Sequence, residues 1–210
     1  MKAGHRKNAH TPITRSELPV DTAALARFLI GKLLVRELPE GAAIGRIVET
    51  EAYVIGDAAG HAYGGMTPRV RALFLERGHA YVYLAYGVSW MLNISSETKG
   101  VGAGVLIRAL EPLEGIAIMA SNRGTGRLRD LARGPGRLAQ ALRIDRSLDG
   151  LDLCRKGPLW LARDDQEPSE IGKGKIGESV RIGITREAER MLRFYLRSSP
   201  YVSGARSLNG

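Results

Sequence analysis

Cysteine is almost absent from this chain of 210 residues, because Cys154 is the only one. An intrachain disulfide framework and a zinc site built on several cysteines are therefore excluded, and the chain suits a reducing compartment. Residues 1–15 are polar and basic and lack the apolar segment of a signal peptide. We therefore expect a location in the cytoplasm or the nucleoid.

Long apolar runs are scarce as well. Residues 78–96 carry no formal charge and approach the length of a bilayer span. The same stretch contains three tyrosines, Asn93 and a central Gly87, which is too polar for a spanning helix and typical of a buried hairpin. We therefore expect no membrane partner.

Acidic residues are outnumbered by basic ones. The chain has 31 Lys and Arg against 22 Asp and Glu, a formal net charge of +9, and 24 of the cations are Arg. The planar guanidinium group suits bidentate contact with phosphate. This balance favours a polyanionic partner.

The length fits one domain with a substantial core. We predict an α+β fold: a single domain with a mostly antiparallel curved sheet, surrounding helices and a protruding β-hairpin. Residues 1–15 are expected to form a flexible basic tail. Strands are expected at 32–38, 43–54, 80–85, 90–96, 101–110, 180–184 and 193–197, and helices at 23–29, 68–76, 112–120 and 135–142.

The strand at 43–54 carries paired acidic residues. Strict alternation places Ile47, Glu49, Glu51 and Tyr53 on one face. Carboxylates two positions apart have Cβ atoms roughly 6–7 Å apart, so partial burial raises at least one pKa and produces a candidate general acid or base. Two alternatives stay open, namely a solvated polar face and a carboxylate pair that hydrolyses an ordinary glycoside.

The hairpin that follows is rich in tyrosine. Tyr81 and Tyr83 share a strand face, while Tyr86 falls at the turn. Aromatic faces bind stacked bases with about 1–3 kcal/mol each and attract cations in addition. Two rings could therefore line a base pocket and the third project from the tip. The alternative is a set of ordinary half-buried strand tyrosines.

Two isolated polar residues add to this picture. His61 lies in a loop just after the acidic strand, and the four histidines lack the spacing of a metal site. Arg108 interrupts an apolar strand, where a guanidinium usually pairs with a carboxylate, and its simplest partner is Glu49 or Glu51. Further along, Gly134-Pro135-Gly136-Arg137 opens a helix and offers free N–H groups for a phosphate, or is simply a capped helix.

Several motifs occur together in one order. They are RIVETEAY at 46–53, YVY at 81–83, Tyr86-Gly87, MLNIS at 91–95, RALEPLEG at 108–115, Gly134-Pro135, and RFY at 193–195 with Ser199-Pro200. In this combination the chain resembles the alkyladenine (3-methyladenine) DNA glycosylase family from about residue 25 to 203. The resemblance implies that residues 16–210 form a DNA glycosylase domain.

The resemblance implies a monofunctional purine DNA glycosylase that acts in DNA repair as a monomer without metal or cofactor. It would flip alkylated or deaminated purines out of double-stranded DNA and hydrolyse the N-glycosidic bond with an activated water. The matching positions imply these roles: catalytic Glu51 and Arg108, base-binding Tyr53, His61, Tyr83, Asn93 and Ile182, and intercalating Tyr86. Separately from the resemblance, we expect Arg69, Gly136 and Arg137 to contact DNA phosphates.

Two competing hypotheses remain. A catalytically silent DNA-binding protein of the same fold explains the basic surface, although such a protein gains nothing from burying a carboxylate beside its ligand. A helix-hairpin-helix glycosylase is suggested only by Gly134-Pro135-Gly136, and the paired carboxylates would then have no role.

Overall fold

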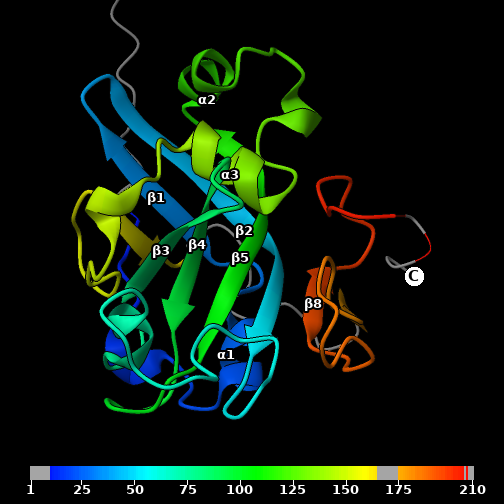
Figure 1. Ribbon diagram of the computed structural model, residues 1–210. Helices are drawn as coiled ribbons and strands as arrows, with labels where there is room; N and C mark the ends of the chain where they lie inside the picture. Colours follow the sequence, from blue (N-terminus) through cyan, green and yellow to red (C-terminus); the bar gives the residue numbers. More distant parts are fainter. Residues whose placement is uncertain (1–9, 165–174, 206, 208–210) are drawn as a thin grey trace, which may run out of the picture.

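The computed structural model describes residues 10–164, 175–205 and 207 (Figure 1). Its strands are β1 (Leu33–Leu38), β2 (Gly41–Tyr53), β3 (Ala80–Ala85), β4 (Ser89–Ser95), β5 (Gly104–Glu114), β6 (Leu159–Ala162), β7 (Ile176–Ser179) and β8 (Arg193–Leu196). Its α-helices are α1 (Thr22–Leu29), α2 (Ile116–Arg123) and α3 (Pro135–Ala141). Short 3-10 helices lie at Arg15–Glu17, Arg71–Phe74, Leu128–Asp130 and Arg146–Leu148.

The strands form one curled sheet in which every pairing is antiparallel. The main order is β3-β4-β5-β2-β1-β6, and β8 joins β2 and β7 off this path. Strand β2 is therefore central, with β5 along one edge and β1 followed by β8 along the other. The prediction of a single α+β domain with a curved antiparallel sheet is confirmed.

Three register shifts break the pairing of β2 with β5, and two of them lie beside Glu49. Ile47 pairs with Leu110 and Glu49 with Ala109, which leaves Val48 as the extra residue on β2. Thr50 then pairs with Ile107, which leaves Arg108 as the extra residue on β5. Bulges re-aim side chains and are frequent beside functional sites.

The bulge at Val48 corrects the strict alternation expected for this strand. Ile47 packs in the main core, and the Thr50 hydroxyl donates to the Ala26 carbonyl of α1 over 2.9 Å. Ile47 therefore shares the face of Thr50 rather than that of the acidic residues. The extra residue turns Glu49 and Glu51 away from α1.

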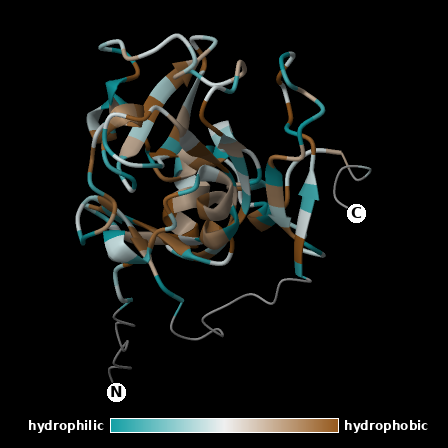
Figure 2. Ribbon diagram, turned by 90° about the horizontal axis from the view of Figure 1, so that it is seen from below, coloured by the Kyte–Doolittle hydropathy of each residue, from teal (hydrophilic) through white to brown (hydrophobic). Residues whose placement is uncertain are grey.

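Helix α1 covers one face of the sheet, and its start follows directly from sequence. Asp21 caps it by accepting from the N–H of Ala24 over 2.7 Å, and its apolar stripe, which includes Leu25 and Leu29, is fully buried. Figure 2 shows hydrophobic residues concentrated on the strands and the helix at the middle of the molecule, with hydrophilic residues mostly on the outer loops. None of the helices in the described residues has the length and apolarity needed to cross a bilayer.

The hairpin of β3 and β4 projects its tip into solvent. Tyr86 and Gly87 both have positive φ, at 51° and 68°, and the Tyr86 side chain is 95% exposed. Helix α3 packs against β4, where a Cβ added at Gly136 would lie 3.0 Å from the side chain of Ser89. The helix start therefore supports the hairpin directly.

Several expected elements differ from the structure. The helix expected at 68–76 is only a 3-10 turn at Arg71–Phe74, and the helix expected from Pro112 begins at Ile116, because Pro112 still belongs to β5. Strand β6 was not expected. The strand expected at 180–184 is absent from the described residues, where β7 lies just before it at Ile176–Ser179.

The expected basic tail divides into two parts. Residues 1–9 lie outside the described residues. Residues 10–15 pack on the sheet, where Ile13 is fully buried and donates its N–H to the Leu161 carbonyl over 3.0 Å. Arg15 pairs with Asp152 over 2.7 Å. The expectation of a flexible segment is therefore corrected for residues 10–15.

Candidate active site

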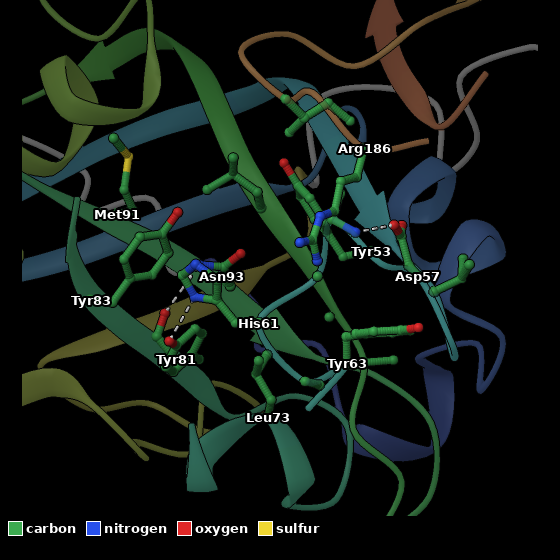
Figure 3. Close-up of a pocket in the computed structure, with 18 of the residues that line it drawn as sticks. Tyr53, Asp57, His61, Tyr63, Leu73, Tyr81, Tyr83, Met91, Asn93 and Arg186 are labelled. Atoms are coloured by element: carbon green, nitrogen blue, oxygen red, sulfur yellow. Dashed lines mark hydrogen bonds between the residues drawn. The ribbon is translucent and has the colours of Figure 1, made fainter. Parts of the chain in front are cut away.

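A cavity of about 670 Å³ opens where β2 ends, beside the β3–β4 hairpin. Its walls come from the end of β2, the loop that carries His61, strands β3 and β4, the start of β5 with the two residues before it, and residues 182–186 after β7. Figure 3 shows side chains from these separate segments pointing into one space. The sequence-predicted residues that line this cavity are Tyr53, His61, Tyr83, Tyr86, Asn93, Arg108 and Ile182.

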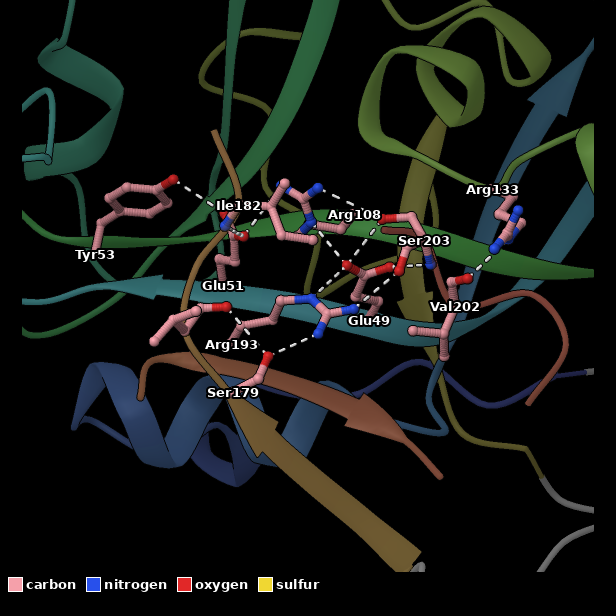
Figure 4. Close-up of polar contacts among 11 residues, drawn as sticks. Glu49, Glu51, Tyr53, Arg108, Arg133, Ser179, Ile182, Arg193, Val202 and Ser203 are labelled. Atoms are coloured by element: carbon pink, nitrogen blue, oxygen red, sulfur yellow. Dashed lines mark hydrogen bonds and ion pairs between the residues drawn. The ribbon is translucent and has the colours of Figure 1, made fainter. Parts of the chain in front are cut away.

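Glu51 lies directly behind the lining and is fully buried. Its carboxylate accepts from the main-chain N–H of Ile182 over 2.7 Å and from the Tyr53 hydroxyl over 3.0 Å, and Nη1 of Arg108 lies 3.1 Å away. Figure 4 shows these partners converging on it. All three partners line the cavity while Glu51 does not, so they fix its carboxylate at the back of the wall.

Glu49 has a different environment. Its carboxylate accepts from Nε of Arg108 and Nε of Arg193, both over 2.8 Å, and from the N–H and hydroxyl of Ser203 over 2.6 and 2.9 Å. Burial raises the pKa of Glu49, but the charges of Arg108 and Arg193 outweigh it, so the pKa is lowered. Glu49 is therefore a saturated anchor outside the cavity, and the two carboxylates do not form an equivalent catalytic pair.

Arg108 forms ion pairs with both Glu49 and Glu51, so it links the two carboxylates. Burial lowers the pKa of the guanidinium and the charges of Glu51 and Glu49 raise it, with a net rise. The bulge on β5 that makes Arg108 the extra residue aims it at this point. The expected pairing with a strand carboxylate is confirmed in both of its forms.

Sequence reasoning missed Arg193 and Ser203. Arg193 is fully buried, and beyond Glu49 it donates Nη1 to the Ser179 hydroxyl over 2.7 Å and Nη2 to the Ser203 carbonyl over 3.0 Å. The signal for Arg193 was present, because it stands between Leu192 and Phe194 as an isolated guanidinium in an apolar strand, as Arg108 does. Ser203 has no such signal, because its role depends on where the chain returns to the sheet.

The aromatic residues form opposite walls. Figure 3 shows Tyr53 across the cavity from His61 and Tyr83. The His61 and Tyr83 rings meet edge to face with centroids 4.4 Å apart, and Nδ1 of His61 is 2.9 Å from the Tyr81 hydroxyl. Burial lowers the pKa of His61, helped by the charge of Arg69, while burial raises the pKa of Tyr81 to about 12. The imidazole and the phenol are thus both neutral at pH 7.

Asn93 lies on the floor of the cavity. It stands on β4 opposite Tyr81 and donates its side-chain amide to the Tyr81 carbonyl over 3.5 Å. Asn93 is buried and lines the cavity. An amide in this position can form hydrogen bonds to the edge of a bound planar ligand.

The predicted phosphate-binding residues are spread around the site. Arg69 is exposed, and its charge reaches His61. Arg137 is exposed and lies 3.2 Å from Asp130, while Gly136 packs against Ser89 and lines a second, smaller hollow on the other side of the hairpin. The structure does not bring these three residues together in one cluster, and their contact with phosphate stays a prediction.

A metal site is built from grouped side chains such as His, Cys, Asp and Glu. In the part of the chain that the structure describes, no group of three or more His, Cys, Asp or Glu is arranged to hold a metal ion. The chemistry that this site supports is that of a fixed carboxylate, a neutral imidazole and aromatic walls.

Comparison with known proteins gives consistent results. The family model described as Methylpurine-DNA glycosylase (MPG) matches residues 16–200. A protein of Mesorhizobium japonicum is 75% identical over 203 residues, covering 97% of this chain and 95% of its own length, and one of Paraburkholderia phytofirmans is 51% identical over 197 residues, covering 94% and 90%. Both carry the name "Putative 3-methyladenine DNA glycosylase". The Homo sapiens protein named "DNA-3-methyladenine glycosylase" is 45% identical over 194 residues, covering 85% of this chain and 63% of its own length.

Proposed function

Because the chain belongs to the methylpurine-DNA glycosylase family and is a monofunctional hydrolase of N-glycosyl bonds, we propose that it flips alkylated and deaminated purines out of double-stranded DNA into the cavity beside Glu51. Hydrolysis there leaves an abasic site. The observation that carries the proposal is the Glu51 carboxylate, held by three donors that themselves line the cavity.

The shape of the cavity supports a flipped base. Its aromatic walls offer faces on which a planar purine can stack from both sides. Extruding a nucleotide costs a few kcal/mol, least for a mispaired or damaged base, so selection begins with the duplex. Tyr86 at the exposed tip fits the space left in the stack and would slow the return of the base.

Glu51 is the proposed general base. It takes a proton from a water, the water oxygen bonds to the sugar C1′, and the purine leaves with the electron pair of the broken C–N bond. Arg108 and the Ile182 N–H hold the carboxylate in one orientation during this step. A purine alkylated at N3 or N7 already carries positive charge and leaves without protonation.

A neutral purine such as hypoxanthine needs a proton or a hydrogen bond as it leaves. His61 is the proposed source, because it lies at the cavity wall and is tied to Tyr81 over 2.9 Å. With one ring nitrogen held by the phenol, the other can face the purine. Asn93 on the floor is the proposed selector among purine edges.

The direct test is base release in the presence of EDTA. Duplexes that carry one hypoxanthine or one ethenoadenine, and methylated DNA, are incubated with wild type, with Glu51→Gln and with Glu37→Gln, which makes the same chemical change on an exposed carboxylate of β1. Wild type and Glu37→Gln should release free base and leave alkali-labile sites. Glu51→Gln should bind damaged DNA but release base about 10²–10⁴-fold more slowly.

The alternative outcome is equally clear. Tight, salt-sensitive DNA binding by wild type without release of any of these bases would favour a catalytically silent DNA-binding protein. Full activity of Glu51→Gln, with fold and DNA affinity unchanged, would remove Glu51 from the chemistry.

A further inference from the structure

The buried charges around the cavity balance one another. In residues 10–164, 175–205 and 207 the buried carboxyl and guanidinium side chains are those of Glu49, Glu51, Asp57, Arg108, Arg181 and Arg193. Three carboxylates therefore face three guanidinium groups. This network carries no net charge, so a preference between cationic and neutral purines depends on the groups nearest the base.

Arg181 has no role in the proposed reaction, and of the six it is the one that lies against an aromatic wall of the cavity. Its side chain is completely buried, and its guanidinium carbon lies 4.7 Å from the centroid of the Tyr53 ring. The group is fixed, because Nη1 donates to the Ala52 carbonyl over 3.0 Å, Nη2 lies 3.3 Å from the Glu187 carbonyl, and both nitrogens bind the Asp57 carboxylate.

The Tyr53 ring separates Arg181 from the cavity. Tyr53 lines the cavity and Arg181 does not. One face of the ring therefore carries a permanent cation, while the ring borders the space where a flipped base would stack. The ring is held in place from its edge as well, because its hydroxyl donates to Glu51.

A ring attracts a cation through the negative potential of its face. A guanidinium already seated on one face draws electron density toward itself and lowers the potential that the opposite face offers. A cationic purine then gains less from stacking on Tyr53, whereas stacking of a neutral, electron-rich purine is not weakened in this way. The Asp57 carboxylate is bonded to the outer nitrogens of Arg181 and also lines the cavity, so it compensates part of this charge, and a test has to change both groups.

We propose that Arg181 is a specificity-determining residue that reduces the attraction of Tyr53 for positively charged purines and so shifts base excision toward neutral purines. This inference rests on the proposed glycosylase function. It concerns the ratio of two rates, which a purely structural role of Arg181 would leave unchanged.

The test measures single-turnover release of cationic 7-methylguanine and of neutral hypoxanthine from otherwise identical duplexes. The main variant is the double substitution Arg181→Gln with Asp57→Asn, which removes both charges and keeps planar amides that can stack and hydrogen bond. The ratio of the 7-methylguanine rate to the hypoxanthine rate should rise roughly 2- to 5-fold, the range expected for one cation–π contact.

Three further variants test the inference even if the double variant does not fold. Arg181→Lys keeps the positive charge and should keep the wild-type ratio. Arg181→Gln alone leaves the Asp57 carboxylate uncompensated at the cavity wall and should raise the ratio further than the double variant does. Arg190→Gln loosens the same loop by removing a 2.5 Å pair with Glu187 and should leave the ratio unchanged.

Each outcome decides the matter. A ratio that stays constant in all folded Arg181 variants, with both rates falling together, overturns the inference and leaves Arg181 as a structural residue. A lower ratio in the charge-removing variants overturns it as well. If wild type releases neither base, the proposed function itself fails, and the inference fails with it.

Discussion

Arg193 and Glu49 form an ion pair in which neither side chain is exposed, with Nε of the arginine 2.8 Å from Oε1 of the glutamate. Strand β8 brings the first residue beside β2, which carries the second. Breaking a buried pair by removing one partner leaves an uncompensated charge and is strongly destabilising. This relationship therefore connects the C-terminal strands to the stability of the site.

The substitution Glu49→Gln should lower the free energy of unfolding by about 3–5 kcal/mol, because two guanidinium groups lose their common carboxylate. The matched control is Glu178→Gln, which breaks the Arg27–Glu178 pair, also 2.8 Å long but with side chains 48% and 43% exposed. The control should cost less than about 1 kcal/mol. Denaturant unfolding measures both, and equal losses would show that the buried network is not a stability element.

Acid should remove the same stabilisation. The pKa of Glu49 is lower in the folded chain than in the unfolded one, so its contribution is complete above the unfolded pKa and is lost as pH falls through the folded value. The stability difference between wild type and Glu49→Gln should therefore shrink below about pH 4. Unfolding titrations at a series of pH values measure this, and a difference independent of pH would contradict the assignment of an ionised Glu49.

The acid limb of activity should respond to Arg69. Burial and the charge of Arg69 lower the pKa of His61, so the imidazole gains a proton only as pH falls below its ordinary range of about 6.5. The positive charge of the protonated His61 should repel a cationic purine in the cavity, so release of cationic purines should slow most. Arg69→Gln should shift this acid limb to higher pH, whereas Arg155→Gln, outside both hollows, should not. An unshifted profile in Arg69→Gln would separate Arg69 from His61.

A substitution at the hairpin tip should affect base flipping without lowering the stability of the fold. Tyr86 is exposed with a φ of 51°, a conformation that glycine adopts easily, so Tyr86→Gly should leave the melting temperature unchanged or slightly raised. The flipped state should lose the stacking of one ring, about 1–3 kcal/mol. Fluorescence of ethenoadenine during flipping measures this, with Val88→Ala as the control at the same tip. A faster return of the base only in Tyr86→Gly supports intercalation, while equal effects argue against it.

A comparison of Gly78 with Gly100 measures the cost of placing a Cβ against Cys154. Gly78 and Gly100 share a φ of 93°, but a Cβ at Gly78 would lie 2.4 Å from Sγ of Cys154, whereas nothing lies within 4 Å at Gly100. Both Gly→Ala changes strain the backbone, and Gly78→Ala should cost about 1–3 kcal/mol more, the usual cost of overpacking. Thermal unfolding of the two variants gives the difference directly. Equal losses would mean that Cys154 moves aside without cost.

The central strand and the hairpin could be predicted because their signals are local. Alternating apolar residues mark β2, and Tyr86-Gly87 marks the turn between β3 and β4. The link between Arg108 and the strand carboxylates also followed from sequence, since an arginine in an apolar strand requires a partner. The family motifs carried the rest of the site, and their roles in catalysis remain predictions.

The bulges could not be predicted from the sequence. No local sequence pattern shows which of two paired strands carries the extra residue. Val48 and Arg108 have that role only in the pairing of β2 with β5. The helix prediction for residues 68–76, before β3, was wrong for a related reason. Thr67-Pro68 is a good helix start, but Phe74 packs so closely on Gly102 that a Cβ there would lie 2.3 Å from the ring. Tertiary packing therefore replaces the helix with a short turn.

The main strand order ends at β3 and β6, and both of these edges are covered by irregular chain. Along β6, Pro12 pairs with Ala162, and a proline has no N–H to offer a further strand. Along β3, residues 149–151 bind the backbone of Ala80 and Val82. Proteins that gather on a polyanion meet copies of themselves at high local density, where open strand edges invite aggregation. Covering β3 and β6 therefore reduces the number of edges through which this enzyme, crowded along DNA, can join its sheet to that of a neighbour.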